Sequence, residues 1–366
     1  MKRTIAFLLA LALTAALTGC GGTAAPAATD VPAETAPAQS LPETTAPQDT
    51  LPAQETEPSS QAGLYLKVSA ITFSLVGESE DIYLGLAPRD QVTWHSDDPS
   101  IVEVADGVLT ATGVGTTTVH ASCNGQELTV TAGCLAQTQE ALEALDPAVL
   151  SAPKRLPPEV DLSGTCTWFD ESAIVGDSIT YFLWQYESGN NYLGNMTFLS
   201  RHGISIHGLV NYSKNMYFEG KEMHVEDIVA AVDPQRTYLM LGCLDFQVPS
   251  SRLMLIDHWT LLLDRIEEKA PDTEIVIISN IPCFTKFTTP NAFNTAVAET
   301  TVQLRQLAAD RGYPFLDLGY YIQDHYGRMP EIYCQDEFHL NDEGSLVWVK
   351  LLRFYALYEQ EGGSLV

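Results

Sequence analysis

The chain has 366 residues, 45% of them hydrophobic, and a formal net charge of −28 at pH 7. This length leaves room for two domains joined by a linker. A surface this acidic repels nucleic acid and anionic lipid headgroups, so we expect neither as a binding partner.

The N-terminus has the features of a bacterial export signal. Met1-Lys2-Arg3 is basic, and the apolar run Thr4–Leu17 is shorter than the roughly 20 residues that a membrane-spanning helix needs. Residues 1–19 are therefore predicted to be a signal peptide. Leu17-Thr18-Gly19-Cys20 resembles the bacterial lipobox, which implies lipidation of Cys20. We expect a lipid-anchored protein on the extracellular face of the cytoplasmic membrane or at the cell surface. The alternative is an ordinary secretory signal.

Residues 20–62 are rich in Ala, Thr, Pro and Glu and contain almost no large apolar side chain. Such a segment cannot bury enough surface to offset the entropy lost on ordering, so we predict a disordered linker.

Residues 63–134 contain short apolar runs separated by turn residues, among them Asn124-Gly125, a strong hairpin signal. This spacing predicts a small β-sandwich. The predicted strands are Leu64–Val68, Val92–Trp94, Val102–Val104, Thr117–Val119 and Leu128–Val130.

The segments Val92–Val102 and Leu109–Thr116 resemble bacterial immunoglobulin-like (group 2) domains. The resemblance implies that Trp94 is a core residue and that residues 63–134 serve as a spacer or an adhesion unit.

From about residue 138 to residue 366 predicted strands alternate with predicted helices, which favours an α/β domain with a parallel sheet covered by helices on both faces. The predicted strands are Ala173–Val175, Ile204–Ile206, Tyr238–Leu241, Glu274–Ile278 and Phe315–Asp317. The predicted helices are Leu253–Lys269, Asn294–Arg311 and Asp342–Tyr358.

Two short segments of this domain carry chemistry. Ser178 follows the first parallel strand within Gly176-Asp177-Ser178-Ile179, at the sheet edge where α/β proteins bind ligands. Asp336 and His339 lie three residues apart just before the last predicted helix. A carboxylate so close to a histidine can orient its ring as the general base that a serine nucleophile requires. Ser178 could otherwise be a helix cap.

At these residues the chain resembles the SGNH hydrolases, also called GDSL esterases, over roughly residues 170–358. The resemblance implies a flavodoxin-like parallel sheet sandwiched by helices, with Ser178 as nucleophile, His339 as base and Asp336 as its partner. It also implies an oxyanion hole made by the amides of Ser178 and a second-block glycine. Gly203 matches that block best, and Gly208 is the weaker choice.

The third block departs from the family pattern Gly-x-Asn-Asp. Gly242 and Asp245 match it, but Leu244 occupies the asparagine position and cannot donate a hydrogen bond. Loss of one oxyanion donor costs about 10²–10³ in rate. Asn280, after the next strand, is a candidate substitute or a simple turn residue.

The cysteines after Cys20 are six, an even number that permits disulfides in an exported protein. Their spacing fixes no pairing, and a tight hairpin at Asn124-Gly125 would keep Cys123 and Cys134 apart. No Cys or His spacing indicates a metal, and we expect no cofactor.

These observations predict a surface-anchored serine esterase that hydrolyses small acyl groups, notably O-acetyl esters on glycans. Two alternatives remain: a catalytically weakened binding or adhesion lipoprotein, motivated by Leu244, and an acyltransferase. The sequence identifies no protein partner.

Overall fold

A computed structural model describes residues 63–212, 216–286 and 291–366 of the chain. The predicted signal peptide, lipobox with Cys20, and linker lie outside these residues. Within the described ranges no helix is both long and apolar enough to cross a bilayer.

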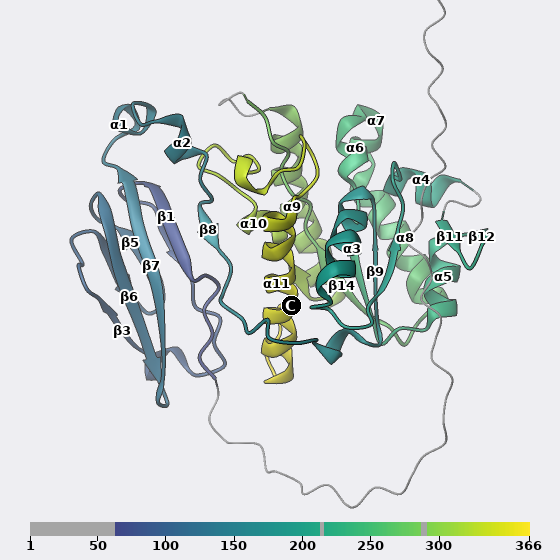
Figure 1. The fold of residues 1–366 in the computed structure, drawn as a ribbon, viewed down its shortest axis with the longest axis horizontal. Coiled ribbons are helices and arrows are strands. Elements are labelled where there is room, and N and C mark those ends of the chain that lie inside the picture. Colours follow the sequence, from purple (N-terminus) through teal and green to yellow (C-terminus); the bar gives the residue numbers. More distant parts are fainter. Residues whose placement is uncertain (1–62, 213–215, 287–290) are drawn as a thin grey trace, which may run out of the picture. The chain divides into compact units, whose positions relative to one another are not determined.

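The first part of the described chain is β-rich (Figure 1). One sheet has the strand order β3-β6-β7-β1-β8, and a second has the order β2-β5-β4. Neighbouring strands are antiparallel except β1 and β7, which run parallel. The strands are β1 (Ala70–Leu75), β2 (Ser79–Asp81), β3 (Thr93–Ser96), β4 (Val102–Ala105), β5 (Val108–Ala111), β6 (Gly115–Cys123), β7 (Gln126–Ala136) and β8 (Arg155–Leu156).

The hairpin predicted at Asn124-Gly125 is confirmed, since these residues join β6 to β7. Both have positive φ, 53° and 80°, as a two-residue type I′ turn requires. Cys123 lies beside this turn and Cys134 pairs with Gly115 at the far end of the ladder. The two thiols are therefore at opposite ends of the hairpin.

The predicted strand Leu64–Val68 is wrong. This segment forms only an isolated bridge between Leu66 and Tyr83. Leu64, Leu66 and Val68 are all buried in the β-rich core. The segment also makes backbone hydrogen bonds, from Lys67 to Ile82 at 2.8 Å and from Leu84 to Tyr65 at 3.1 Å, but these do not extend into a strand.

The second part of the chain contains a five-stranded sheet in which every strand runs parallel to its neighbours. Its order is β10-β9-β13-β14-β15, which confirms the predicted α/β fold class. The strands are β9 (Ser172–Gly176), β10 (Thr197–Ser200), β13 (Arg236–Met240), β14 (Glu274–Ile278) and β15 (Phe315–Leu316).

Helices cover both faces of this sheet (Figure 1). They are α3 (Ser178–Asn190), α4 (Ile206–Asn211), α5 (Val225–Val232), α6 (Cys243–Gln247), α7 (Pro249–Leu253), α8 (Leu255–Lys269), α9 (Ala292–Arg311), α10 (Leu318–Tyr321) and α11 (Asp342–Gln360). Shorter elements are α1 (Gln139–Glu143), α2 (Pro147–Leu150), the hairpin β11 (Met216–Phe218) and β12 (Lys221–Met223), and the single 3-10 turns Arg89–Gln91, Thr167–Phe169 and Glu331–Tyr333.

Alternate residues of the central strands point to different cores. Ile174 and Tyr238 pack with residues of α3 and α11, whereas Val175 and Leu239 pack with residues of α4, α5, α8 and α9. Burial on both faces explains why these strands are continuous apolar runs.

The strand predicted at Ile204–Ile206 is also wrong. Ser205 is the N-cap of α4, and its Oγ accepts a hydrogen bond from the amide of Gly208 at 2.9 Å. The strand that pairs with the edge of β9 opposite β13 is instead β10. Three residues with apolar ends fit either element. The Ser205 cap favours a helix, and so does the hydrogen bond from the Ile206 amide to the distant Asp245 carboxylate at 2.8 Å.

The predicted helix boundaries hold within a few residues. Gly312, at φ +71°, ends α9 as expected. The predicted start at Asn294 is wrong, because Asn291 caps the helix and Asn294 lies inside its first turn. The buried Asn294 carboxamide instead accepts from the amide of Cys283 at 2.8 Å and donates to its carbonyl at 3.1 Å.

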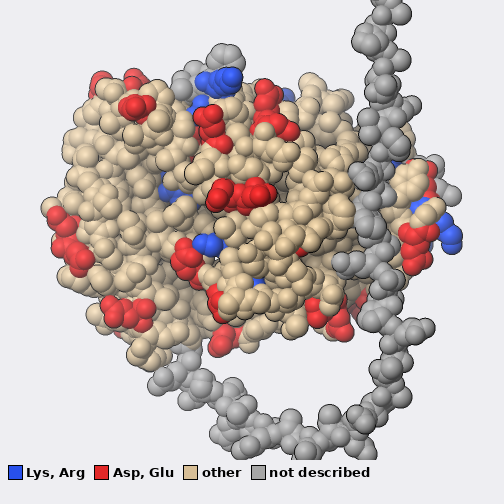
Figure 2. Space-filling model, viewed as in Figure 1, with Lys and Arg blue, Asp and Glu red and all other residues tan. Residues whose placement is uncertain are grey.

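Acidic side chains are spread over the face seen in Figure 2, where few Lys and Arg side chains are visible. They do not gather into one patch there.

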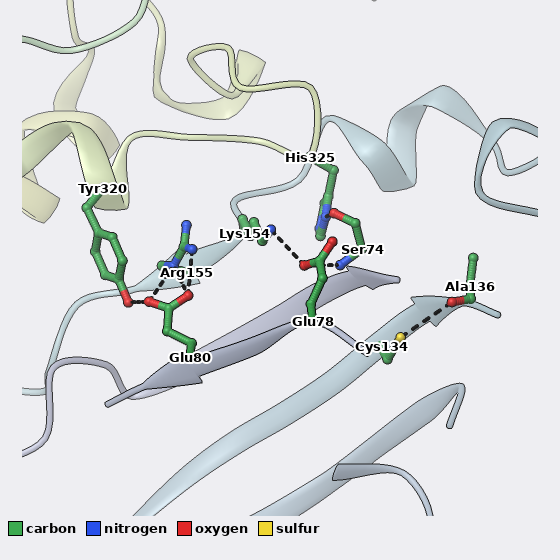
Figure 3. Close-up of polar contacts among 9 residues, drawn as sticks. All are labelled: Ser74, Glu78, Glu80, Cys134, Ala136, Lys154, Arg155, Tyr320 and His325. Atoms are coloured by element: carbon green, nitrogen blue, oxygen red, sulfur yellow. Dashed lines mark hydrogen bonds and ion pairs between the residues drawn. The ribbon is translucent and has the colours of Figure 1, made fainter. Parts of the chain in front are cut away.

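Polar contacts join the β-rich part to the α/β part (Figure 3). Strand β8 pairs with the edge of β1. Its Arg155 donates to the Glu80 carboxylate at 2.6 Å and lies 4.1 Å from the centre of the Tyr320 ring, while the Tyr320 hydroxyl also donates to Glu80. Nearby, Ser74 Oγ lies 2.9 Å from Nδ1 of His325.

His325 makes these contacts sensitive to pH. Burial, together with Lys154 and Arg155, lowers the pKa of His325 from its ordinary 6.5 to about 4, against the opposing effect of Glu78. The neutral ring therefore contributes stability above pH 6.5 that is lost as pH falls from 6.5 towards 4. We expect His325→Gln to show a smaller loss of unfolding free energy between pH 7 and pH 4.5 than the wild type. The expected difference is on the order of 2 kcal/mol, measured by urea unfolding at both pH values. Equal losses would contradict this assignment.

Candidate active site

The candidate nucleophile lies where β9 gives way to α3. Asp177 caps this helix, its carboxylate accepting from the amide of Ile179 at 3.0 Å, and Ser178 is the first helical residue. Gly176 permits this sharp transition, because a Cβ at this position would lie 1.8 Å from Oγ1 of Thr180 and 2.9 Å from the carbonyl oxygen of Met240. Ser178 is thereby held at the carboxyl edge of the sheet.

The structure brings together the three residues predicted to form a catalytic triad. His339 Nε2 lies 2.8 Å from Ser178 Oγ, and His339 Nδ1 lies 2.8 Å from Asp336 Oδ2. With the ring proton on Nδ1 facing the carboxylate, Nε2 is free to accept the serine proton. This series of hydrogen bonds is the geometry in which a histidine activates an alcohol.

The loop that carries Asp336 and His339 is shaped by its own hydrogen bonds. Asp336 Oδ1 accepts from the amides of Phe338 and His339 at 2.8 and 2.9 Å, and Cys334 bridges to Leu340. Partial burial raises the pKa of Asp336, but the bonds from the His339 ring and from these two amides outweigh burial and lower the pKa below its ordinary value. The carboxylate is therefore charged at neutral pH.

A small pocket opens beside the nucleophile, with a cavity volume of about 80 Å³. This is well below the roughly 300–1,000 Å³ of sites for drug-sized ligands. The pocket is lined by Asp177, Ser178, Gly203, Ile204, Cys243, Leu244, Gln247, Phe338 and His339. Its apolar wall suits a small acyl group.

Two buried carboxylates fix the loops around this pocket. Asp177 also accepts from the amide of Cys243 at 3.3 Å, and Asp245 accepts from the amides of Ile206 and His207 at 2.8 and 3.1 Å. Burial raises the pKa of Asp177 to about 6 despite the hydrogen bonds from the Ile179 and Cys243 amides. Burial likewise raises the pKa of Asp245. Both carboxyls connect loops that follow different strands.

Of the residues considered for the oxyanion hole, some line the pocket and others do not. Gly203 lines the pocket, at φ +70°. Gly208 lies in α4 with its amide bonded to Ser205. Leu244 lines the pocket, whereas Asn280 is buried and donates from Nδ2 to the carbonyl of Leu241 at 2.9 Å. Asn280 is therefore not among the residues that line the pocket and does not replace the missing asparagine.

Cys243 is a second potential nucleophile in this pocket. Burial raises the pKa of its thiol well above the ordinary value, and a protonated thiol is a poor nucleophile. The six cysteines of the described ranges are all free. Across those ranges no three His, Cys, Asp or Glu side chains are grouped to hold a metal ion.

Phe182 is one of four aromatic residues that follow the nucleophile at near-helical spacing in the sequence, which made it a candidate to line a sugar- or acyl-binding cleft, whereas Gln247 was not predicted. The Phe182 ring lies 4.6 Å from the His339 ring, measured between centroids, and Gln247 lines the pocket. Helical spacing could have indicated Gln247 as well, because it lies three residues after Leu244.

Comparisons with known proteins identify this region. Residues 174–346 match the model of the GDSL-like lipase/acylhydrolase family. No curated protein sequence matches the chain.

Several solved structures are similar to the chain. A GDSL-like lipase from Bacteroides thetaiotaomicron has 11% identity, with 52% of this chain and 89% of that chain covered and a TM-score of 0.38. A member of the lipolytic G-D-S-L family from Veillonella parvula has 16% identity, coverage of 50% and 97%, and a TM-score of 0.38. A carbohydrate esterase family 3 protein from Talaromyces cellulolyticus has 14% identity, coverage of 52% and 98%, and a TM-score of 0.36.

The fold and the family match define the class of this protein as a carboxylic ester hydrolase. The α/β part of the chain is similar to GDSL-like lipases and acylhydrolases over residues 174–346.

Proposed function

We propose that this protein hydrolyses small acyl esters, specifically O-acetyl groups on surface glycans, with Ser178, His339 and Asp336 as its catalytic triad. The observation that carries the proposal is the series of 2.8 Å contacts from Ser178 Oγ to His339 and from His339 to Asp336.

The reaction follows from this geometry. Ser178 Oγ attacks the ester carbonyl while His339 Nε2 accepts its proton, and Asp336 stabilises the resulting imidazolium. The carbonyl oxygen becomes negative and faces the amides of Ser178 and Gly203. The C–O bond to the alcohol then breaks as His339 returns the proton to the leaving oxygen, which leaves an acyl-enzyme. Water, deprotonated by His339, attacks this ester and releases the carboxylic acid and free Ser178.

The substrate class rests on the small apolar pocket and on the predicted location of the protein. A cavity of about 80 Å³ walled by Ile204, Leu244 and Phe338 favours acetyl over long acyl chains. The lipobox-like sequence ending at Cys20 motivates a lipid anchor that holds the enzyme near cell-surface polymers.

A fluorophosphonate probe tests the proposal directly, because it reacts with an activated serine. We expect the full chain to be labelled on Ser178, as located by peptide mass spectrometry, and to hydrolyse p-nitrophenyl acetate. His339→Ala should lower the labelling rate by at least about 10²-fold, since general-base assistance contributes 10²–10⁴. A chain that is neither labelled on Ser178 nor active on the ester would overturn the proposal in favour of a binding protein.

A further inference from the structure

The pocket contains few groups that can donate a hydrogen bond to a substrate oxygen. Among the nine residues that line it, Ile204, Leu244 and Phe338 have no side-chain donor, and Asp177 is an acceptor. Ser178 and His339 are engaged with each other, and a thiol such as that of Cys243 is a weak donor. The Gln247 carboxamide, with two N–H groups, is thus the remaining strong side-chain donor of the lining.

Gln247 and Leu244 lie on the same face of α6 and form one wall of the pocket. The two residues are three apart in a helix, so their Cβ atoms are about 5–6 Å apart on one face. Both line the pocket with Ser178 and Gly203. The helix is itself anchored to the nucleophile loop, since the amide of Cys243 at its start donates to Asp177 at 3.3 Å.

The Gln247 carboxamide is available to a ligand. Gln247 is an exposed residue. Its carboxamide makes no hydrogen bond to another of the residues that the structure describes. Its two methylene groups give it the reach and freedom to turn towards an oxygen bound beside Ser178. An amide donor is worth most when aimed at the position where negative charge develops.

We infer that Gln247 is a catalytic residue, whose carboxamide donates a hydrogen bond to the ester carbonyl oxygen as that oxygen becomes negative. It completes an oxyanion hole with the amides of Ser178 and Gly203, on the helix where Leu244 cannot donate. This inference rests on the proposed esterase function.

The test is the steady-state kinetics of Gln247→Ala with p-nitrophenyl acetate. Removal of one oxyanion donor is expected to lower kcat by about 10²–10³-fold. KM should change little, because the interaction strengthens only in the transition state. Gln247→Glu, which keeps the length but replaces the donor with a negative charge, should lower kcat at least as much. Both variants should melt at the wild-type temperature, which excludes a merely structural role.

Gln185→Ala is a matched control, since Gln185 is an exposed glutamine on α3. It should retain wild-type kcat. A kcat for Gln247→Ala within about threefold of the wild type, far below the effect of losing a donor, would overturn the inference while leaving the esterase function intact. A wild-type chain with neither turnover nor labelling of Ser178 would instead count against the proposed function.

Discussion

Ser178→Ala is expected to lower the kcat for p-nitrophenyl acetate by about 10⁴–10⁶-fold, as loss of the nucleophile does in serine hydrolases. The substitution removes the oxygen that lies 2.8 Å from His339 Nε2 and forms the acyl-enzyme. It leaves the helix in place, because Ser178 is a first-turn residue and Asp177 provides the cap. The measurement is the initial rate at saturating substrate, with circular dichroism as a check on folding.

Ser188→Ala supplies the control for this experiment. Ser188 is an exposed serine of the same helix, whose hydroxyl donates to the carbonyl of Trp184. Its variant should keep wild-type activity. Turnover by Ser178→Ala at a rate near that of the wild type would show that another group performs the chemistry.

The largest effect on stability is expected at Arg328. Its guanidinium donates to Asp324 Oδ2 at 2.7 and 2.9 Å and to the carbonyl of Thr285 at 2.7 Å. The exposed fractions of the two side chains are 5% for Arg328 and 0% for Asp324. Arg328→Met would leave the Asp324 carboxylate buried without its cation, which typically costs about 3–5 kcal/mol. Urea unfolding at pH 7 should report a loss of this size.

A double variant distinguishes the cost in stability of losing the whole Arg328–Asp324 ion pair from the cost of losing only one partner. Asp324→Leu with Arg328→Met removes both charges, so it should be less destabilised than Arg328→Met alone. The control is Lys269→Met, which breaks an ion pair with Asp227 whose side chains are 51% and 40% exposed. An exposed pair contributes about 0–1 kcal/mol. A cost for Arg328→Met no larger than that of Lys269→Met would refute the argument from burial.

The sequence predicted the fold and the site best where the local residue pattern and the tertiary packing favour the same element. The strand at Glu274–Ile278 was predicted with its observed bounds, because its four apolar residues, Ile275 to Ile278, form a continuous buried run. Such a run is typical of a parallel strand covered on both faces. Ser178, Asp336 and His339 could be identified because each belongs to a short, specific pattern next to a strand or helix end.

Predictions failed where the deciding contact is made by residues distant in the sequence. The segment Ile204–Ile206 could be a strand or a helix start, and its anchoring amide bond is to Asp245, 39 residues away. Asn280 looked like a possible donor, but the carbonyl of Leu241 on the neighbouring strand end takes its amide. Gln247 belongs to no recognisable sequence motif. Its role is indicated only by its position in the pocket lining with Ser178 and Gly203.

Strand β8 limits where the chain can be truncated to separate its β-rich part from its α/β part. A cut after β7, at the change of sequence pattern, would leave Arg155–Leu156 without the edge of β1 that pairs with them. It would also deprive Tyr320 and His325 of Glu80 and Ser74, their hydrogen-bonding partners in the β-rich part. The esterase domain obtained by such a truncation would carry an unpaired strand and uncovered polar side chains. The natural unit for expression and engineering therefore includes both parts.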